Sequence, residues 1–298
     1  MCLTTCLLYV DTVGNGIGQA IEVVFIVFLT AEFSKKKSDL QHAYYYISYI
    51  SYVIDTLGNV SVWTVEMFPE NTDNWLSAIC LAFPWFIYFE AATWSFMLSL
   101  NRCTALAFPT FHNKIWNGLW LKFAIALMLI YPFLVNGYTL FDAECRLRYK
   151  QPECRDYYSA MTTATVISTT CLALLSMLLI IFAVCKSHGT STSSKKAVIE
   201  RRMILHTTLS SVMLILWIGT VYMGSVIAQM SDFFSHLSFI VYMLQHYPPM
   251  VLIVVINPIF RRLFFNFTRI HKLLRKQDVA PSIVTTTAKN CPLQAQET

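Results

Sequence analysis

Residues 119–141 read LWLKFAIALMLIYPFLVNGYTLF, an apolar run whose one charged residue is Lys122. A helix needs about 20 apolar residues to cross the roughly 30 Å of bilayer hydrocarbon, so this stretch is long enough to span a membrane. Over the whole chain of 298 residues, 56% are hydrophobic and only 13% are charged. Soluble domains carry about 25% charged residues, and the mean hydropathy here is +0.52. We therefore predict an integral membrane protein.

Six further apolar blocks of similar length are separated by short polar segments, and none alternates like a strand of a membrane barrel. The seven blocks together predict an all-α membrane protein, a seven-transmembrane helix bundle over residues 13–260 that follows a short N-terminal segment at 1–12. The predicted spans are 13–33, 43–67, 77–108, 119–141, 159–185, 203–229 and 236–260.

The distribution of Lys and Arg predicts the direction of the bundle. All but four of the 22 Lys and Arg residues lie around the first, third and fifth loops or in the C-terminal tail. Because basic loops stay on the cytoplasmic side, we predict a multi-pass plasma-membrane protein with its N-terminus outside and its C-terminus inside. The four exceptions share the fourth loop with four acidic residues: Arg146, Arg148, Lys150 and Arg155.

After the last span, residues 261–276 combine apolar residues at helical spacing with basic residues on the other face. This pattern predicts an amphipathic helix that lies in the inner membrane interface. The alternative is an ordinary basic flank that stops transfer of the last span. Residues 277–298 are polar, and we expect them to form a disordered cytoplasmic tail.

Ionisable residues at bilayer depth are costly, and here no Lys or Arg lies at their depth to pair with them. They are Glu22, Asp55, Glu90 and His246, with Gln245 beside the histidine. Each acid must then be protonated, hydrated or bound to a cation. We expect Asp55, Glu90, Gln245 and His246 to form a polar core or to line a ligand pocket. The alternative is that hydrogen-bonded carboxyl groups only hold the helices together.

The inner end of the third span reads SLNRCTALAFPTFHNKIW over residues 99–116, and the seventh span ends in Asn257-Pro258-Ile259-Phe260. The first stretch resembles the signature of nematode serpentine chemoreceptors of the Srg and Srv group. Both stretches are similar to motifs of rhodopsin-like G-protein-coupled receptors. The chain differs from rhodopsin-like receptors in three ways. Asn101 replaces an acid, and Arg261 replaces a tyrosine. The sixth span contains no proline.

The resemblance implies a chemosensory receptor that binds a small molecule in the outer half of the bundle and signals to a heterotrimeric G protein. It also implies sensory cilia of neurons as a location. Asp55 falls near the position of the sodium-binding aspartate of rhodopsin-like receptors. The residues expected at the G-protein side are Asn101, Arg102, Glu200, Arg201, Arg202, Asn257 and Pro258.

Arg102 lacks the adjacent acid of the larger family, and we expect Glu200 to be its resting partner. The alternative is an anchor that extends to the lipid headgroups. By the resemblance, Cys80 would be bonded to the loop after the fourth span. That loop contains Cys145 and Cys154, which could instead pair with each other. We expect at least one disulfide that involves this loop.

The main alternative function is a proton-coupled transporter of small solutes that uses the mid-membrane carboxylates, although the two halves show no internal repeat. We expect no enzyme activity, since the seven His residues are scattered and no hydrolase or metalloprotease motif is present. We also expect no cofactor or metal requirement and no nucleic-acid partner. The lipid membrane is an expected partner, and the sequence predicts neither the ligand nor the oligomeric state.

Overall fold

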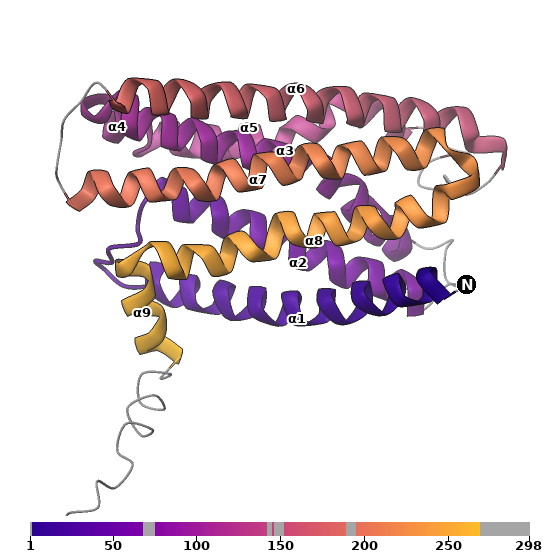
Figure 1. Ribbon diagram of the computed structural model, residues 1–298, viewed down its shortest axis with the longest axis horizontal. Helices are drawn as coiled ribbons and strands as arrows, with labels where there is room; N and C mark the ends of the chain where they lie inside the picture. Colours follow the sequence, from indigo (N-terminus) through magenta and orange to yellow (C-terminus); the bar gives the residue numbers. More distant parts are fainter. Residues whose placement is uncertain (1, 68–74, 142–144, 146–151, 189–194, 269–298) are drawn as a thin grey trace, which may run out of the picture.

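The computed structural model of the chain describes residues 2–67, 75–141, 145, 152–188 and 195–268. Seven helices of 18 residues or more run along its long axis (Figure 1). They correspond one to one to the predicted spans, and the predicted helical bundle is confirmed. Their bounds are α1 (Cys2–Phe33), α2 (Ala43–Met67), α3 (Trp75–Ala107), α5 (Leu119–Asn136), α6 (Arg155–His188), α7 (Lys195–Val226) and α8 (Ser231–Ile256).

Several element boundaries differ from the predicted ones. Helix α1 begins at Cys2 rather than at residue 13, and α5 ends at Asn136, where the 3₁₀ helix η2 (Gly137–Phe141) takes over. Two short α-helices lie at the end of the bundle opposite the N-terminus (Figure 1). These are α4 (Pro109–Ile115), which was not predicted, and α9 (Pro258–Thr268). The remaining elements are the 3₁₀ helices η3 (Pro152–Cys154) and η4 (Ala228–Met230).

Prolines determine two of these boundaries. The residue before a proline is disfavoured in the α conformation, so α3 ends before Pro109, which starts α4. In the same way, α8 stops at Asn257, whose backbone is extended (φ −99°, ψ 106°). The Oδ1 atom of Asn257 accepts the backbone N–H groups of Ile259 at 3.0 Å and Phe260 at 3.2 Å. Asn257 therefore caps α9, and the break comes earlier than the predicted one after Phe260.

Five of the long helices are apolar and long enough to cross a membrane: α1, α5, α6, α7 and α8. Helices α2 and α3 carry more polar residues, and many of those side chains are buried between helices. They are Ser48, Ser51, Asp55 and Ser61 of α2, and Glu90, Thr93, Ser95, Ser99, Asn101, Arg102 and Thr104 of α3. Polar groups at membrane depth must be satisfied within the protein, so a polar interior suits a bundle that lies in lipid.

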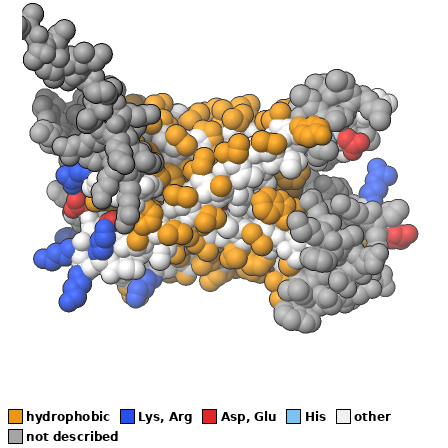
Figure 2. All heavy atoms as spheres, turned by 90° about the horizontal axis from the view of Figure 1, so that it is seen from below, with side chains coloured by type: hydrophobic (Ala, Val, Ile, Leu, Met, Phe, Trp, Pro, Cys, Tyr) orange, Lys and Arg blue, Asp and Glu red, His pale blue; other side chains and the backbone are white. Residues whose placement is uncertain are grey.

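The outer surface has the complementary composition. Many large hydrophobic side chains are exposed, including Leu119, Leu134 and Leu178, each at least 61% accessible. Figure 2 shows a broad hydrophobic band around the middle of the bundle on the face drawn there. Lys and Arg side chains gather at the end that carries α9 (Figure 2). This arrangement fits a belt of lipid around the middle with water at both ends.

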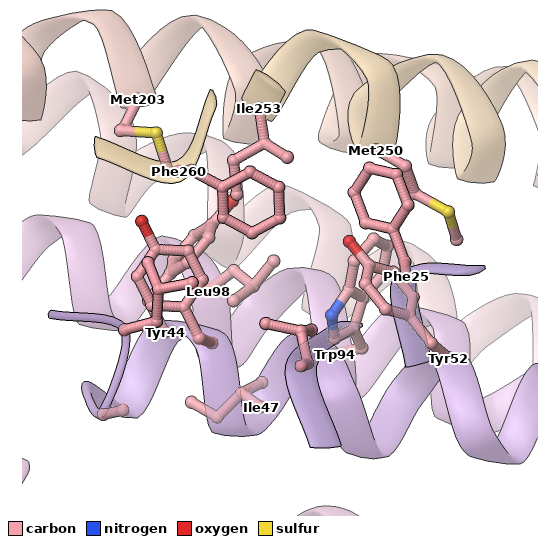
Figure 3. Packing of buried hydrophobic residues seen from close by; sticks show 14 of the residues in the cluster. Phe25, Tyr44, Ile47, Tyr52, Trp94, Leu98, Met203, Met250, Ile253 and Phe260 are labelled. Carbon is pink, nitrogen blue, oxygen red and sulfur yellow. The ribbon is translucent and has the colours of Figure 1, made fainter. Parts of the chain in front are cut away.

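An aromatic core lies toward the α9 end and joins α1, α2, α3, α7, α8 and α9 (Figure 3). Phe260 of α9 stacks on Phe25 of α1 and Tyr45 of α2, with ring centroids 5.6 and 5.7 Å apart. Phe264 also packs on Phe25, at 5.0 Å, and on Phe28, at 5.2 Å. Because lipid tails are as apolar as these rings, close packing rather than escape from water stabilises this core. The contacts hold α9 against the side of α1.

Gly18 of α1 lies directly against the ring of Tyr247 on α8. A Cβ atom added at Gly18 would lie 2.1 Å from the ring of Tyr247, whereas one added at Gly16 would meet nothing within 4 Å. We predict that Gly18→Ala destabilises the folded protein by about 1–3 kcal/mol through overpacking. Gly16→Ala is the matched control, since both changes raise helix propensity equally. The measurement is thermal unfolding in detergent, and equal midpoints for the two variants would contradict the predicted contact.

Candidate functional site

Six buried or partly buried polar side chains meet near the middle of α1, α2 and α8, and we call them the polar cluster. They are Gln19 and Glu22 of α1, Asp55 of α2, and Tyr242, His246 and Tyr247 of α8. Glu22 is fully buried, and Asp55 and His246 are 2% and 3% exposed. The cluster therefore brings together three of the ionisable residues that the sequence placed at bilayer depth.

Asp55 is the hydrogen-bond hub of the polar cluster. Its Oδ2 accepts from Nδ2 of Asn59 at 2.9 Å and from Nε2 of Gln19 at 3.2 Å. Its Oδ1 accepts a short hydrogen bond from the hydroxyl of Tyr242. The same Gln19 nitrogen also lies 3.1 Å from Oε2 of Glu22 and 2.9 Å from the hydroxyl of Tyr247, so its two N–H groups are shared among three acceptors. One amide thus reaches all three helices, and these bonds compensate for the lost hydration of the acids.

His246 lies beside both acids. Its Nε2 is 2.8 Å from Oε1 of Glu22 and 3.5 Å from Oδ2 of Asp55. Aromatic rings surround the imidazole: Tyr242 is stacked at 5.9 Å, and Tyr52 and Trp94 lie at 5.8 and 5.7 Å. The ring is therefore fixed in orientation and shielded by apolar surface.

Two of the predicted polar-core residues lie outside this network. Glu90 of α3 accepts a long hydrogen bond of 3.4 Å from Ser51, and its Oε1 has no partner among the described residues. Gln245 is fully buried, and neither its amide nitrogen nor its amide oxygen has a partner in that part of the chain. Both residues are buried in the bundle, but their position in the sequence did not distinguish them from the residues of the cluster.

A second buried polar group lies nearer the α9 end, around Arg102. The guanidinium of Arg102, only 6% exposed, lies over the ring of Tyr44 with its Cζ 3.9 Å from the ring centroid. The hydroxyl of Tyr44 is in turn 3.0 Å from Nδ1 of His206 on α7. Arg102 of α3 is thus linked to α2 and α7 through an aromatic ring, which can hold a cation by its negative face.

The other predicted G-protein-side residues are placed as follows. Asn101 is buried, and its Nδ2 has no partner among the described residues. Asn257 donates to the hydroxyl of Tyr45 at 2.5 Å, and Pro258 begins α9. Arg202 is exposed on α7. The side chains of Glu200 and Arg201 lie outside the described residues, so the expected pairing of Arg102 with Glu200 stays a prediction.

The structure joins Cys145 to Cys154, nine residues apart within the loop after the fourth span. Cys80 is buried as a free thiol on α3. The sequence left both pairings open, and the structure has the one within the loop.

A small cavity opens between α3, α6 and α7, on the side of the polar cluster away from α9. It is lined only by uncharged side chains: Tyr88, Thr165, Val166, Thr169, Trp217, Ile218 and Val221. Trp217 stacks on Tyr88 at 5.6 Å and lies 5.4 Å from Tyr242. The hydroxyl of Thr169 is buried without a partner among the described residues. Through Tyr242, this cavity adjoins the polar cluster.

The sequence reasoning missed Gln19, Tyr242 and Tyr247 in the polar cluster and Tyr44 and His206 near Arg102. A signal existed for two of them, since Gln19 precedes Glu22 by three residues and Tyr242 precedes His246 by four. That spacing puts each on the same helix face as its partner. For Tyr44 and His206, which lie on α2 and α7, the sequence held no comparable signal.

Comparison with known families gives one match. The family described as serpentine type 7TM GPCR chemoreceptor Srv matches residues 22–276, a range that contains the polar cluster except Gln19, as well as Arg102 and Asn257. No curated protein matches the chain.

The polar cluster generates a stability prediction. We expect Gln19→Met to destabilise the protein by roughly 1–3 kcal/mol, because two buried carboxyl groups and the Tyr247 hydroxyl lose a donor. Ala20→Met places the same side chain at the exposed neighbouring position and should be nearly neutral. Thermal unfolding in detergent compares the two. A Gln19→Met midpoint no lower than that of Ala20→Met would mean that the amide does not hold the cluster together.

Proposed function

The chain belongs to the Srv family of serpentine seven-transmembrane chemoreceptors, and we propose that it detects an uncharged small molecule and signals to a heterotrimeric G protein. It is a multi-pass membrane protein of a receptor family rather than an enzyme. The observation that carries the proposal is the position of Arg102. The cation of the predicted signature lies buried at the basic end of the bundle, against the ring of Tyr44 on α2, whose hydroxyl is hydrogen-bonded to His206 on α7.

We place the N-terminus outside the cell and the α9 end inside. The support is the concentration of Lys and Arg at the α9 end (Figure 2), as expected for a cytoplasmic face. In this orientation α9 lies at the inner interface and the loop with the Cys145–Cys154 disulfide faces the oxidising exterior. The bundle would then extend over 13–260, with 1–12 outside and 277–298 inside.

We assign ligand binding to the outer half of the bundle, at the cavity beside Trp217. The cavity has a volume of about 10 Å³, room for about one water molecule, so a ligand would have to displace side chains such as Trp217 to enter. Its lining contains no charged side chain, which favours an uncharged and largely apolar molecule. The buried hydroxyl of Thr169 would donate to an acceptor on that molecule. A ligand that displaces Trp217 also acts on Tyr242, the neighbour that donates to Asp55. The ligand thereby biases a bundle with two states.

At the inner end, we propose that Tyr44 holds Arg102 in the resting state. Asn101 stands where rhodopsin-like receptors have an acid, so Arg102 lacks that neighbouring carboxylate. The ring of Tyr44 lies against the guanidinium of Arg102 instead. The bond between Tyr44 and His206 ties this contact to α7. Movement of α7 would then release Arg102 toward the G protein, and α7 itself carries the exposed Arg202.

The first test is a G-protein activation assay in cells that express the full chain, with a panel of uncharged small molecules. We expect a ligand response that Arg102→Ala abolishes at unchanged surface expression. Arg262→Ala removes an exposed cation of the same end and should retain the response. A response that survives Arg102→Ala would refute coupling through Arg102. Solute flux without G-protein activation, lost in Asp55→Asn, would favour a transporter.

The second test needs no ligand. We expect Tyr44→Ala to raise basal G-protein activation several-fold, because Arg102 loses a cation–π contact of about 0.5–2 kcal/mol. Tyr44→Phe keeps the ring but loses the bond to His206, and should give a smaller rise. Tyr46→Ala is the matched control, since that ring stacks on Phe33 instead. Equal basal activity in Tyr44→Ala and Tyr46→Ala would rule out the resting contact.

A further inference from the structure

Three side chains of the polar cluster have the chemistry of metal ligands. Glu22, Asp55 and His246 come from α1, α2 and α8, and each can offer one ligand atom such that all three atoms lie within 4.8 Å of one another. We propose that these residues bind a divalent transition-metal ion of the Zn²⁺ class. This proposal concerns the ion alone and does not depend on the identity of the sensed molecule or on the G protein.

The distances suit such an ion. Zinc binds histidine nitrogen and carboxylate oxygen at about 2.0–2.2 Å, and tetrahedral geometry then separates ligand atoms by roughly 3.3 Å. Nε2 of His246 lies 2.8 Å from Oε1 of Glu22 and 3.5 Å from Oδ2 of Asp55. These separations bracket the required value, so small side-chain movements admit the ion.

Charge balance points the same way. Two carboxylates and one imidazole are almost completely buried, and in the described residues neither acid is paired with Lys or Arg. An uncompensated charge at this depth is costly. A divalent cation bound to two carboxylates and a neutral imidazole gives a site with no net charge.

The surroundings resemble the outer shell of a metal site, in which ligands are themselves held by hydrogen bonds. Asp55 accepts from Tyr242, Asn59 and Gln19, and Gln19 also donates to Glu22. The rings of Tyr242, Tyr52 and Trp94 fix the plane of His246. The ligand atoms are thus oriented in advance, and three protein ligands leave a fourth position for water.

The nitrogen ligand from His246 indicates which class of metal ion the site would bind. Nitrogen together with carboxylate oxygen suits Zn²⁺ and neighbouring transition metals, whereas Mg²⁺ and Ca²⁺ prefer oxygen ligands alone. An ion held by α1, α2 and α8 would cross-link three helices. Because it binds the folded bundle, it would raise the stability of the protein.

The test uses the purified full-length protein in detergent, stripped with a chelator and then dialysed against Zn²⁺. We expect about one Zn²⁺ per chain and a higher unfolding temperature. In His246→Gln and Asp55→Asn, affinity should fall at least about tenfold. His236→Gln on the same helix removes a histidine outside the site, and this variant should bind as the parent does.

X-ray absorption at the zinc edge keeps the test decisive if a site variant fails to fold. We expect nitrogen and oxygen neighbours at about 2.0–2.2 Å, with imidazole scattering and no sulfur. A sulfur shell at about 2.3 Å would assign the ion to cysteines and overturn the proposal. So would undiminished binding in His246→Gln, failure of the parent protein to retain Zn²⁺, or stabilisation by Na⁺ and not by Zn²⁺.

Discussion

The structure depends on one constraint: hydrocarbon offers no water to a buried carboxyl group, so the protein must supply its hydrogen bonds. Asp55 meets this constraint with donors from α1, α2 and α8. The same bonds fix how these helices are rotated, because each donor must face the acid. The need to satisfy a buried acid by hydrogen bonds thereby helps to specify how α1, α2 and α8 pack together.

The polar cluster lies between the two regions to which we assign binding and signalling. On one side, Tyr242 contacts Trp217 at the wall of the uncharged cavity. On the other, His246 contacts Trp94, which belongs to the same aromatic core as Tyr44 (Figure 3). A ligand that moved Trp217 would therefore act, through Tyr242, on the buried polar side chains of the cluster. These side chains have few other hydrogen-bond partners within reach. Such groups favour discrete arrangements over gradual deformation, as a switch requires.

Arg102 illustrates how one substitution changes the physics of a motif. With Asn101 in place of an acid, a buried guanidinium needs another partner, and the face of Tyr44 provides one without adding a second charge. A cation–π contact is weaker than a desolvated ion pair. Among the described residues, Tyr44 thereby connects Arg102 of α3 to His206 of α7, so that three helices meet at this cation.

The sequence by itself determined the seven helices and identified Glu22, Asp55, Glu90 and His246 as ionisable residues within them, because span length and hydropathy are local properties of the chain. It also gave the receptor family through residues 99–116, and the family match confirms it. Only the tertiary structure decided that three of these four groups converge while Glu90 stays apart, and that Cys154 pairs with Cys145 rather than Cys80. The physical reason is that hydropathy reports depth, whereas the direction of a side chain depends on helix rotation, which packing between distant segments sets.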